Sequence, residues 1–371
     1  MTPIDVSARA HAVRAGFEGI DALIVVDLTN IRWLTGFTGS NGIAVVLADS
    51  VVLVTDGRYG AQAERQLAAA SCRGDVVVRR TAAEVLAAVA AAAAVSGATR
   101  VGFESAHTTH QRFVELAALV PDAELVPTVG LVEVGRRTKD AAELERIELA
   151  CSIADNALAR VAPTIVPGRT EIQIRNDLEA IMRELGAAGP SYETIVATGF
   201  RNAPLPHHRP TDTPVEDGHT VIIDVGALVD GYHSDMTRTF LVGRHSPLQR
   251  EVYDVVLAAQ VAGVAAVRPG ITTAELDAVC RGIITDAGFG PWFTHGTGHG
   301  VGLLIHEDPF VNSAGHWVLQ PGDVVTVEPG VYRDDLGGVR VEDLVEVTST
   351  GCRTLTRTPK DFPCLPSAPT T

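Results

Sequence analysis

The sequence lacks the features by which nucleic-acid-binding and secreted proteins are recognised. Its 371 residues carry a formal net charge of −15, whereas nucleic-acid-binding domains present a basic surface. Only Lys139 and Lys360 are lysines, which we attribute to coding bias because alanines are also abundant. The five cysteines are scattered without a CxxC pair, a pattern typical of reduced thiols in a cytoplasmic protein. We therefore expect a cytoplasmic protein without a nucleic-acid partner.

Leader and membrane segments are not expected either. Residues 1–30 have no basic start followed by an apolar region, so we expect no secretory signal. The alanine-rich stretch 82–95 is too short and too weakly apolar to span a membrane. No GxGxxG motif follows a predicted strand, which leaves a dinucleotide site unsupported. We expect no membrane partner.

The length and a hydrophobic content of 46% are sufficient for two domains with ample cores. Residues 1–130 predict an α/β domain, because strand-like segments alternate with helix-like segments. The strands are expected at 22–26, 43–47, 51–55 and 75–78, and the helices at 58–70, 81–95 and 108–119.

A second domain is expected over residues 140–362, after a linker at 131–139. It begins with a long amphipathic helix whose apolar positions include Ile147 and Leu149. The proline-containing residues 363–371 are expected to form a loose tail.

Two acidic stretches of the second domain repeat each other. Asp224 and Asp235 are expected on two strands joined through an Asp-Gly turn, and Glu328 and Glu342 on two matching strands. Asp224 and Glu328 are 104 residues apart, and flanking glycines keep that spacing. The first stretch alone is equally compatible with a hairpin of two solvated aspartates. The repeat predicts two related halves that bring four carboxylates to one centre, where their repulsion requires cations.

Histidines are concentrated near these stretches. His295, His299 and His306 lie within twelve residues among glycines, which favours a functional over a structural role. His207 and His208 are adjacent, and neighbouring side chains of an extended chain point in opposite directions. We therefore expect His207 to face the site and His208 to point away.

These motifs resemble those of the pita-bread metallopeptidases, which include aminopeptidase P, prolidase and short prokaryotic Xaa-Pro peptidases. TNIRWLTGFTGSN at 29–41 and TDGRY at 55–59 are similar to the creatinase-type N-terminal domain. The catalytic motifs follow in the family's order as PHHRPTD, IDVGALVDGYHSDMTRTF, HGTGHGVGLLIHEDP, VEPGVY and GGVRVED. The resemblance implies an α+β pita-bread catalytic domain with an internal pseudo-twofold repeat, preceded by a smaller α/β creatinase-type domain.

The resemblance also implies five metal ligands, which fall on Asp224, Asp235, His299, Glu328 and Glu342. In the family, the residues matching Asp235 and Glu342 bridge two ions, Asp224 holds one ion, and His299 with Glu328 holds the other. Four carboxylates and one imidazole favour Mn²⁺ or Co²⁺, with Zn²⁺ and Fe²⁺ as alternatives. Two divalent ions would balance the four carboxylate charges.

Catalytic roles follow from the same resemblance. A metal-bridging hydroxide would attack the scissile carbonyl, and Glu328 would shuttle its proton. His207, His295 and His306 are expected on the substrate side, where His207 and His306 would hydrogen-bond the substrate or the oxyanion. Arg340 would brace the substrate or the ligand groups, with a structural ion pair as the alternative.

The sequence thus predicts an enzyme that hydrolyses the Xaa-Pro bond at the N-terminus of peptides, as aminopeptidase P does. Dipeptide-only prolidases often carry a basic residue directly after the His-Glu-x-Pro run, and Phe310 stands there. Prolidase activity on Xaa-Pro dipeptides is the alternative. A metal-free creatinase-like hydrolase or a non-catalytic binding protein is disfavoured by the intact set of five ligands.

Residues 33–41 combine two aromatic residues with glycines and small polar residues. This composition suits a loop that packs against another surface, and a connection packed on its own domain is the alternative. In relatives, the matching loop can reach a neighbouring subunit's active site. We therefore expect a homodimer or larger assembly in which Trp33 or Phe37 lines the neighbour's cleft.

Overall fold

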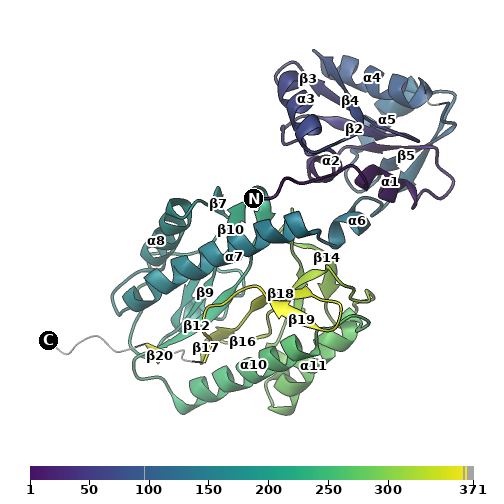
Figure 1. Cartoon of the computed structure of the whole chain (residues 1–371). Helices are drawn as coiled ribbons and strands as arrows, with labels where there is room; N and C mark the ends of the chain where they lie inside the picture. Colours follow the sequence, from purple (N-terminus) through teal and green to yellow (C-terminus); the bar gives the residue numbers. More distant parts are fainter. Residues whose placement is uncertain (96, 362–363, 366–371) are drawn as a thin grey trace. The chain divides into compact units, whose positions relative to one another are not determined.

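The computed structural model describes residues 1–95, 97–361 and 364–365, and the chain divides into two units, Met1–Arg136 and Arg137–Thr371 (Figure 1). The unit boundary lies within the stretch expected as a linker, 131–139, part of which is helix α6 (Glu133–Arg137). Within the described ranges, no helix combines the length and the apolar character that crossing a membrane requires.

The first unit is built on a six-stranded mixed sheet with the strand order β4-β3-β2-β1-β5-β6. Its strands are β1 (Ala22–Val25), β2 (Ile43–Val46), β3 (Val51–Asp56), β4 (Gly74–Arg79), β5 (Arg100–Glu104) and β6 (Glu124–Thr128). Its helices are α1 (Arg9–Arg14), α2 (Leu28–Thr35), α3 (Gly60–Ala69), α4 (Ala82–Val95) and α5 (His110–Leu119). The predicted strands and helices are confirmed, and β5, β6, α1 and α2 are additional elements.

Residues 33–41 form the end of helix α2 and the loop after it, but their two aromatic rings do not reach toward another surface. Trp33 lies inside helix α2, and Trp33 and Phe37 are only 5% and 1% exposed. The Arg9 guanidinium lies 4.8 Å from the centre of the Trp33 ring, and the Phe37 ring meets the Tyr59 ring edge-on. Both rings are therefore packed inside their own unit. Burial of such a ring contributes about 1.5–3 kcal/mol to the stability of the fold. The prediction that Trp33 or Phe37 lines a neighbour's cleft is therefore wrong.

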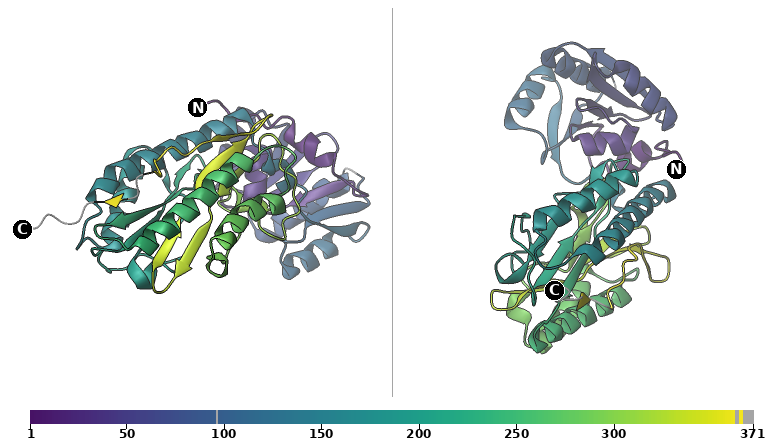
Figure 2. Two further views of the ribbon diagram at one scale, coloured as in Figure 1. Left: turned by 90° about the horizontal axis from the view of Figure 1, so that it is seen from below. Right: turned by 90° about the vertical axis from the view of Figure 1, so that its left-hand side faces the viewer.

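The second unit contains strands between two pairs of long helices (Figures 1 and 2). Its helices are α7 (Ala141–Val161), η1 (Ala162–Thr164), α8 (Glu171–Glu184), α9 (Gly199–Asn202), α10 (Pro247–Ala266), α11 (Thr273–Asp286) and η2 (Gly290–Trp292). Its strands are β7 (Gly189–Pro190), β8 (Ile195–Thr198), β9 (Thr220–Asp224), β10 (Ala227–Val229), β11 (Tyr232–His233), β12 (Thr237–Val242), β13 (Gly298–Gly300), β14 (Glu307–Val311), β15 (Val324–Val327), β16 (Gly330–Arg333), β17 (Gly337–Arg340), β18 (Asp343–Val347), β19 (Cys352–Thr354) and β20 (Cys364–Leu365).

The two helix pairs cover two separate apolar cores. Helices α7 and α8 pack on the sheet β20-β12-β9-β8, and helices α10 and α11 pack on the sheet β14-β13-β15-β18-β19. Helix α7 begins after its cap Asp140, as predicted. Ile147 is fully buried in this helix, whereas Leu149, which we expected on the apolar face, is 41% exposed.

The internal repeat is visible in the backbone. Thr170 caps helix α8 and Thr272 caps helix α11, each through a reciprocal capping box. Matched glycines have φ angles between 84° and 103°, a region that disfavours any residue with a Cβ; they are Gly168 and Gly270, Gly186 and Gly288, and Gly218 and Gly322. The two halves therefore repeat in conformation as well as in sequence.

The acidic residues lie on the two predicted hairpins, at the points where the paired strands are interrupted, because β9 pairs with β12 and β15 with β18, both antiparallel. The Asp230–Gly231 turn joins β10 to β11, and Asp235 lies between β11 and β12. Glu342 likewise lies between β17 and β18. Side chains alternate between the two faces within a strand, so residues at strand ends are freer to converge on one point.

The predicted loose tail is partly ordered. Cys364 and Leu365 form β20 and pair in parallel with Leu241 and Val242 of β12. The other residues of the predicted tail, 363 and 366–371, lie outside the described residues.

Candidate metal centre

A cavity of about 490 Å³ in the second unit brings together the residues that the sequence analysis assigned to the site. They come from both halves of the repeat and from the loops between the strands. These residues are His207, Asp224, Asp235, His295, His299, His306, Glu328, Arg340 and Glu342.

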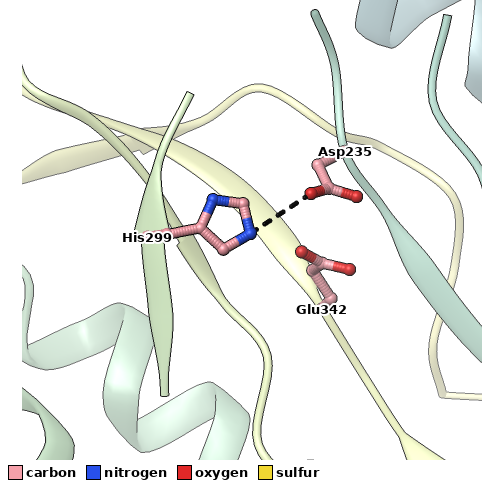
Figure 3. A group of neighbouring side chains, drawn as sticks. All are labelled: Asp235, His299 and Glu342. Atoms are coloured by element: carbon pink, nitrogen blue, oxygen red, sulfur yellow. Dashed lines mark ion pairs between the residues drawn. The ribbon is translucent and has the colours of Figure 1, made fainter. Parts of the chain in front are cut away.

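Three of these side chains point toward one another (Figure 3). Asp235, His299 and Glu342 each offer a ligand atom, and these atoms all lie within 4.8 Å of one another. All three residues are buried. Burial raises the pKa of Asp235 and of Glu342 well above the usual range, and the neighbouring carboxylates raise both further. Without a cation, this group therefore binds protons tightly.

Glu342 shows that the group fits a cation. Its Oε2 accepts a hydrogen bond from Thr237 Oγ1 at 2.7 Å. Its Oε1 is buried and has no hydrogen-bond partner among the residues that the structure describes. A buried carboxylate oxygen without a partner costs free energy, and a divalent cation between the carboxylates would supply the missing partner.

Glu328 and His299 form an ion pair at this centre, with 3.2 Å between Glu328 Oε1 and His299 Nε2. Burial alone would raise the pKa of Glu328, but the hydrogen bond and the charge of His299 lower it to about 2. Burial alone would lower the pKa of His299, and Glu328 raises it instead. Thr326 Oγ1 also donates to Glu328 Oε1 at 3.1 Å.

Asp224 is held by two neighbours, one of which the sequence analysis missed. Arg340 Nη2 donates to Asp224 Oδ2 at 2.5 Å, so Arg340 contacts a predicted metal ligand directly. The Tyr192 hydroxyl contacts Oδ1 of Asp224 and, at 2.5 Å, Oδ1 of Asp235. A phenol has one proton, so one of these two contacts requires a protonated carboxyl group, which agrees with the raised pKa of Asp235.

His295 and His306 both line the cavity but differ in their contacts. His295 Nδ1 donates to the Gly296 carbonyl at 2.7 Å, and its Nε2 accepts from the Tyr332 hydroxyl at 2.8 Å. Both of its ring nitrogens are thus engaged by the protein. The His306 ring lies 4.4 Å from the His299 ring, centre to centre. Burial lowers the pKa of His295 and of His306, which favours neutral imidazoles.

His207 and His208 both border the cavity, but their side chains have different surroundings. His207 is exposed and lines the cavity. His208 also borders the cavity, although its Nε2 lies 2.8 Å from Glu171 Oε2 at the start of α8. The chain turns here, with the His208 amide donating to the Leu205 carbonyl, so the rule for extended chains does not apply. The His208 imidazole is thus engaged by Glu171, and the expectation that it points away from the site stays a prediction.

The comparisons with known proteins agree with this arrangement. An Xaa-Pro dipeptidase from Bacillus anthracis is 37% identical, with a TM-score of 0.93 over 97% of this chain and 100% of that one. An Xaa-Pro dipeptidase of Pyrococcus furiosus is 45% identical over 61% of this chain and 65% of that protein. The X-Pro aminopeptidase of Thermotoga maritima is 30% identical, with a TM-score of 0.86 over 96% of this chain and 100% of that one.

The family assignment rests on both units. Residues 12–138 match the creatinase/prolidase N-terminal domain, which agrees with the α/β fold of the first unit. Residues 145–349, more than half of the chain, match metallopeptidase family M24 and contain every residue of the cavity described above. The fold is the predicted pita-bread fold, and the family implies divalent metal ions. The chain belongs to metallopeptidase family M24.

Proposed function

We propose that the protein is a dinuclear Xaa-Pro dipeptidase that acts in the cytoplasm. Asp224, Asp235, His299, Glu328 and Glu342 would hold two divalent ions, Mn²⁺ first, with Co²⁺, Zn²⁺ and Fe²⁺ as alternatives. The observation that carries this proposal is the buried carboxylate group around Glu342, whose Oε1 has no partner among the described residues.

The bound ions would polarise the scissile carbonyl and activate a water molecule. Glu328 is the proposed proton carrier, because its carboxylate lies at the cavity beside this group. His306 and His207 would donate hydrogen bonds to the carbonyl oxygen as negative charge develops on it. Arg340 orients Asp224, and Tyr332 links Arg340 to His295, which we propose to shape the substrate side of the cavity.

Dipeptides are the preferred substrate class on two grounds. Relatives that cover much of the chain are named Xaa-Pro dipeptidases, whereas our expectation of an aminopeptidase P-like activity has less support. Among the described lining residues, Arg209 and Arg340 carry permanent positive charges. Arg340 is occupied by Asp224, while the Arg209 side chain is 83% exposed and, within the part of the chain that the structure describes, forms an ion pair with Glu193 alone, at 3.1 Å. Arg209 is therefore available to the free carboxylate of an Xaa-Pro dipeptide.

The second candidate is an Xaa-Pro aminopeptidase acting on longer peptides. It is favoured by Phe310, which lines the cavity and is 43% exposed at the position where strict dipeptidases often carry a basic residue. A homodimer or larger assembly stays a prediction, to be tested by mass measurement in solution.

The two candidates are separated by the substrate. Kinetics of the Mn²⁺-loaded protein would be compared on Xaa-Pro, Xaa-Pro-amide and Xaa-Pro-Yaa-Zaa peptides, before and after chelation. We expect the highest kcat/KM on the dipeptide and loss of all activity with the chelator. Faster cleavage of the tetrapeptide would assign the aminopeptidase activity, and activity that survives metal removal would contradict a metallopeptidase mechanism.

A further inference from the structure

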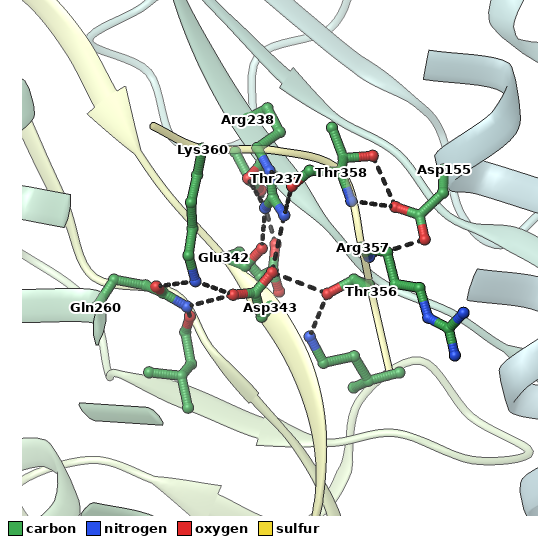
Figure 4. Close-up of polar contacts among 12 residues, drawn as sticks. Asp155, Thr237, Arg238, Gln260, Glu342, Asp343, Thr356, Arg357, Thr358 and Lys360 are labelled. Atoms are coloured by element: carbon green, nitrogen blue, oxygen red, sulfur yellow. Dashed lines mark hydrogen bonds and ion pairs between the residues drawn. The ribbon is translucent and has the colours of Figure 1, made fainter. Parts of the chain in front are cut away.

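A buried polar network adjoins Glu342 of the candidate metal centre (Figure 4). Its middle is Asp343, which follows Glu342 in the chain and is 1% exposed. Asp343 Oδ1 accepts hydrogen bonds from Arg238 Nη2 at 2.8 Å and from Thr356 Oγ1 at 2.9 Å. Its Oδ2 accepts from Gln260 at 3.0 Å and from Lys360 Nζ. Every carboxylate lone-pair direction is thus used by the protein, so Asp343 is not a further metal ligand.

Arg238 joins this network to both strands that end at the metal centre. Its Nη1 donates to the carbonyl of Thr237 at 2.9 Å and to the carbonyl of Glu342. The Glu342 amide in turn donates to the Thr237 carbonyl at 3.1 Å. Thr237 is paired with Asp224 across the sheet and lies two residues after Asp235. A single guanidinium therefore fixes the backbone beside both shared carboxylates.

The segment Thr356–Lys360 completes the network from outside the sheets. The Thr358 carbonyl accepts from Arg238 Nε at 3.0 Å and from Nη2 at 2.6 Å. Asp155 of helix α7 holds the segment in place by accepting from the backbone amides of Arg357 and Thr358, both at 2.8 Å. The segment is thereby fixed to a helix of the first half and to strand β18 of the second.

Such a network is a poor means of gaining stability alone. Buried ion pairs lose hydration, and well-packed apolar residues of similar volume are often equally stable or better. The charged groups do fix the orientation of the residues that they contact, because each hydrogen bond holds a donor and an acceptor in one geometry. Groups that orient metal-binding side chains in this manner typically account for about 10–100-fold in metal affinity or activity.

We propose that the segment Thr356–Lys360 is a brace that positions Asp235 and Glu342 for metal binding, acting through Arg238 and Asp343. This inference rests on the proposed metal site. Arg238, Asp343 and Lys360 are positioning residues, since none of them lines the cavity.

The test is a calorimetric titration of the metal-free full-length protein with Mn²⁺, together with urea unfolding of the same samples. Arg238→Met is the direct variant, but it removes a buried cation and risks misfolding. Lys360→Met is milder, because the Lys360 side chain is 22% exposed. We expect Lys360→Met to weaken Mn²⁺ binding about 10-fold or more, with a matching fall in kcat, and Lys360→Arg to retain the affinity.

The matched control is a second buried Arg–Asp pair in the same unit. Arg137 and Asp323 are 2.5 Å apart with side chains 6% and 0% exposed, and neither lines the cavity. Arg137→Met should lower the free energy of unfolding but leave Mn²⁺ affinity unchanged. The brace is contradicted if Lys360→Met binds Mn²⁺ normally, or if Arg137→Met weakens binding equally at equal loss of stability. The titration does not depend on peptide cleavage, so a wild-type protein that binds Mn²⁺ but cleaves no Xaa-Pro peptide would contradict the proposed substrate and not the brace.

Discussion

The two halves of the second unit present carboxylates at matching backbone positions but surround them differently. Asp224, at the end of β9, faces the permanent charge of Arg340 and the hydroxyl of Tyr192. Glu328, directly after β15, faces His299, whose charge depends on pH. The repeat therefore sets where the acids lie, and residues that differ between the two halves set how each acid is charged.

The asymmetry lies in side chains that the second half supplies. His299 is on β13 and Arg340 is the last residue of β17. Both the imidazole of His299 and the buried guanidinium of Arg340 thus come from the second half. Arg340 nevertheless forms its ion pair with Asp224 of the first half. The halves are equivalent as scaffolds and unequal in chemistry.

The largest effect on the comparison of the two halves is expected from removing the two acids that both ions would share. Asp235→Ala from the first half and Glu342→Ala from the second should each abolish activity and the binding of at least one metal. The expected loss exceeds the about 10–100-fold that is typical of residues that only support ligands. Metal content and kcat check this. Two ions per chain and near-normal turnover in either variant would contradict a shared ligand and with it the dinuclear site.

A second prediction compares the histidines that the two halves contribute to the substrate side. His207→Ala and His306→Ala should keep normal metal content but lower kcat by about 10²–10³-fold, as expected for groups that stabilise developing charge. His316→Ala is the control, because this exposed histidine stacks on Trp317 outside the cavity. Loss of metal in the His207 or His306 variant would mean that a ligand has been misassigned.

The sequence was sufficient for the residues that carry spaced motifs and insufficient for those that act through tertiary contacts. Apart from Glu193, the acids and histidines of the cavity were named in advance, because repeat spacing and glycine-rich runs single them out. Tyr192 reaches Asp224 and Asp235 across 32 and 43 residues, and no spacing rule identifies one tyrosine. Arg238 and Asp343, 105 residues apart, were missed for the same reason.

The same distinction explains the errors in the first unit. The stretch 33–41 has a composition that suits either an exposed loop or a buried connection, and composition alone does not tell where a ring points. Tertiary packing decided the outcome, with Trp33 and Phe37 filling the core. The strands of this unit were predictable because continuous β-branched runs such as 43–46 are buried over their whole length.

A third prediction concerns the different lining residues that the two halves contribute to the cavity. The first half contributes Arg209, whereas the second contributes Phe310. Arg209→Met should raise KM for an Xaa-Pro dipeptide by up to about fivefold, the equivalent of the about 1 kcal/mol of an exposed ion pair, and leave kcat unchanged. KM for the Xaa-Pro-amide should not change, since it has no carboxylate. Arg244→Met, at an exposed arginine paired with Asp217, is the control. Equal effects on both substrates would contradict a carboxylate contact.

The smallest expected effect concerns the stability of the metal-free protein. The pKa values of Asp235, Glu342 and His299 are raised above 3.8, 4.5 and 6.5 by folding. Each group therefore binds its proton more tightly in the folded state, and its contribution to stability is complete below the unfolded pKa and is lost as pH rises through the folded one. Glu328, with its pKa lowered to about 2, is fully ionised in both states above about pH 6.5 and adds no slope there.

Burial lowers the pKa of His295 and of His306, so these groups add an opposite slope that is complete about one unit above 6.5. Above about pH 7.5, the metal-free protein should thus lose stability as pH rises, and bound Mn²⁺ should reverse the trend by replacing the protons. Urea unfolding across this range measures the slope. Asp235→Asn and Glu342→Gln each remove one proton-binding group, so each should flatten the slope, and equal flattening is expected because both acids are buried in the same group. A slope removed by only one variant would show that a single half governs the charge of the centre, and stability rising with pH in the metal-free protein would contradict the raised pKa values.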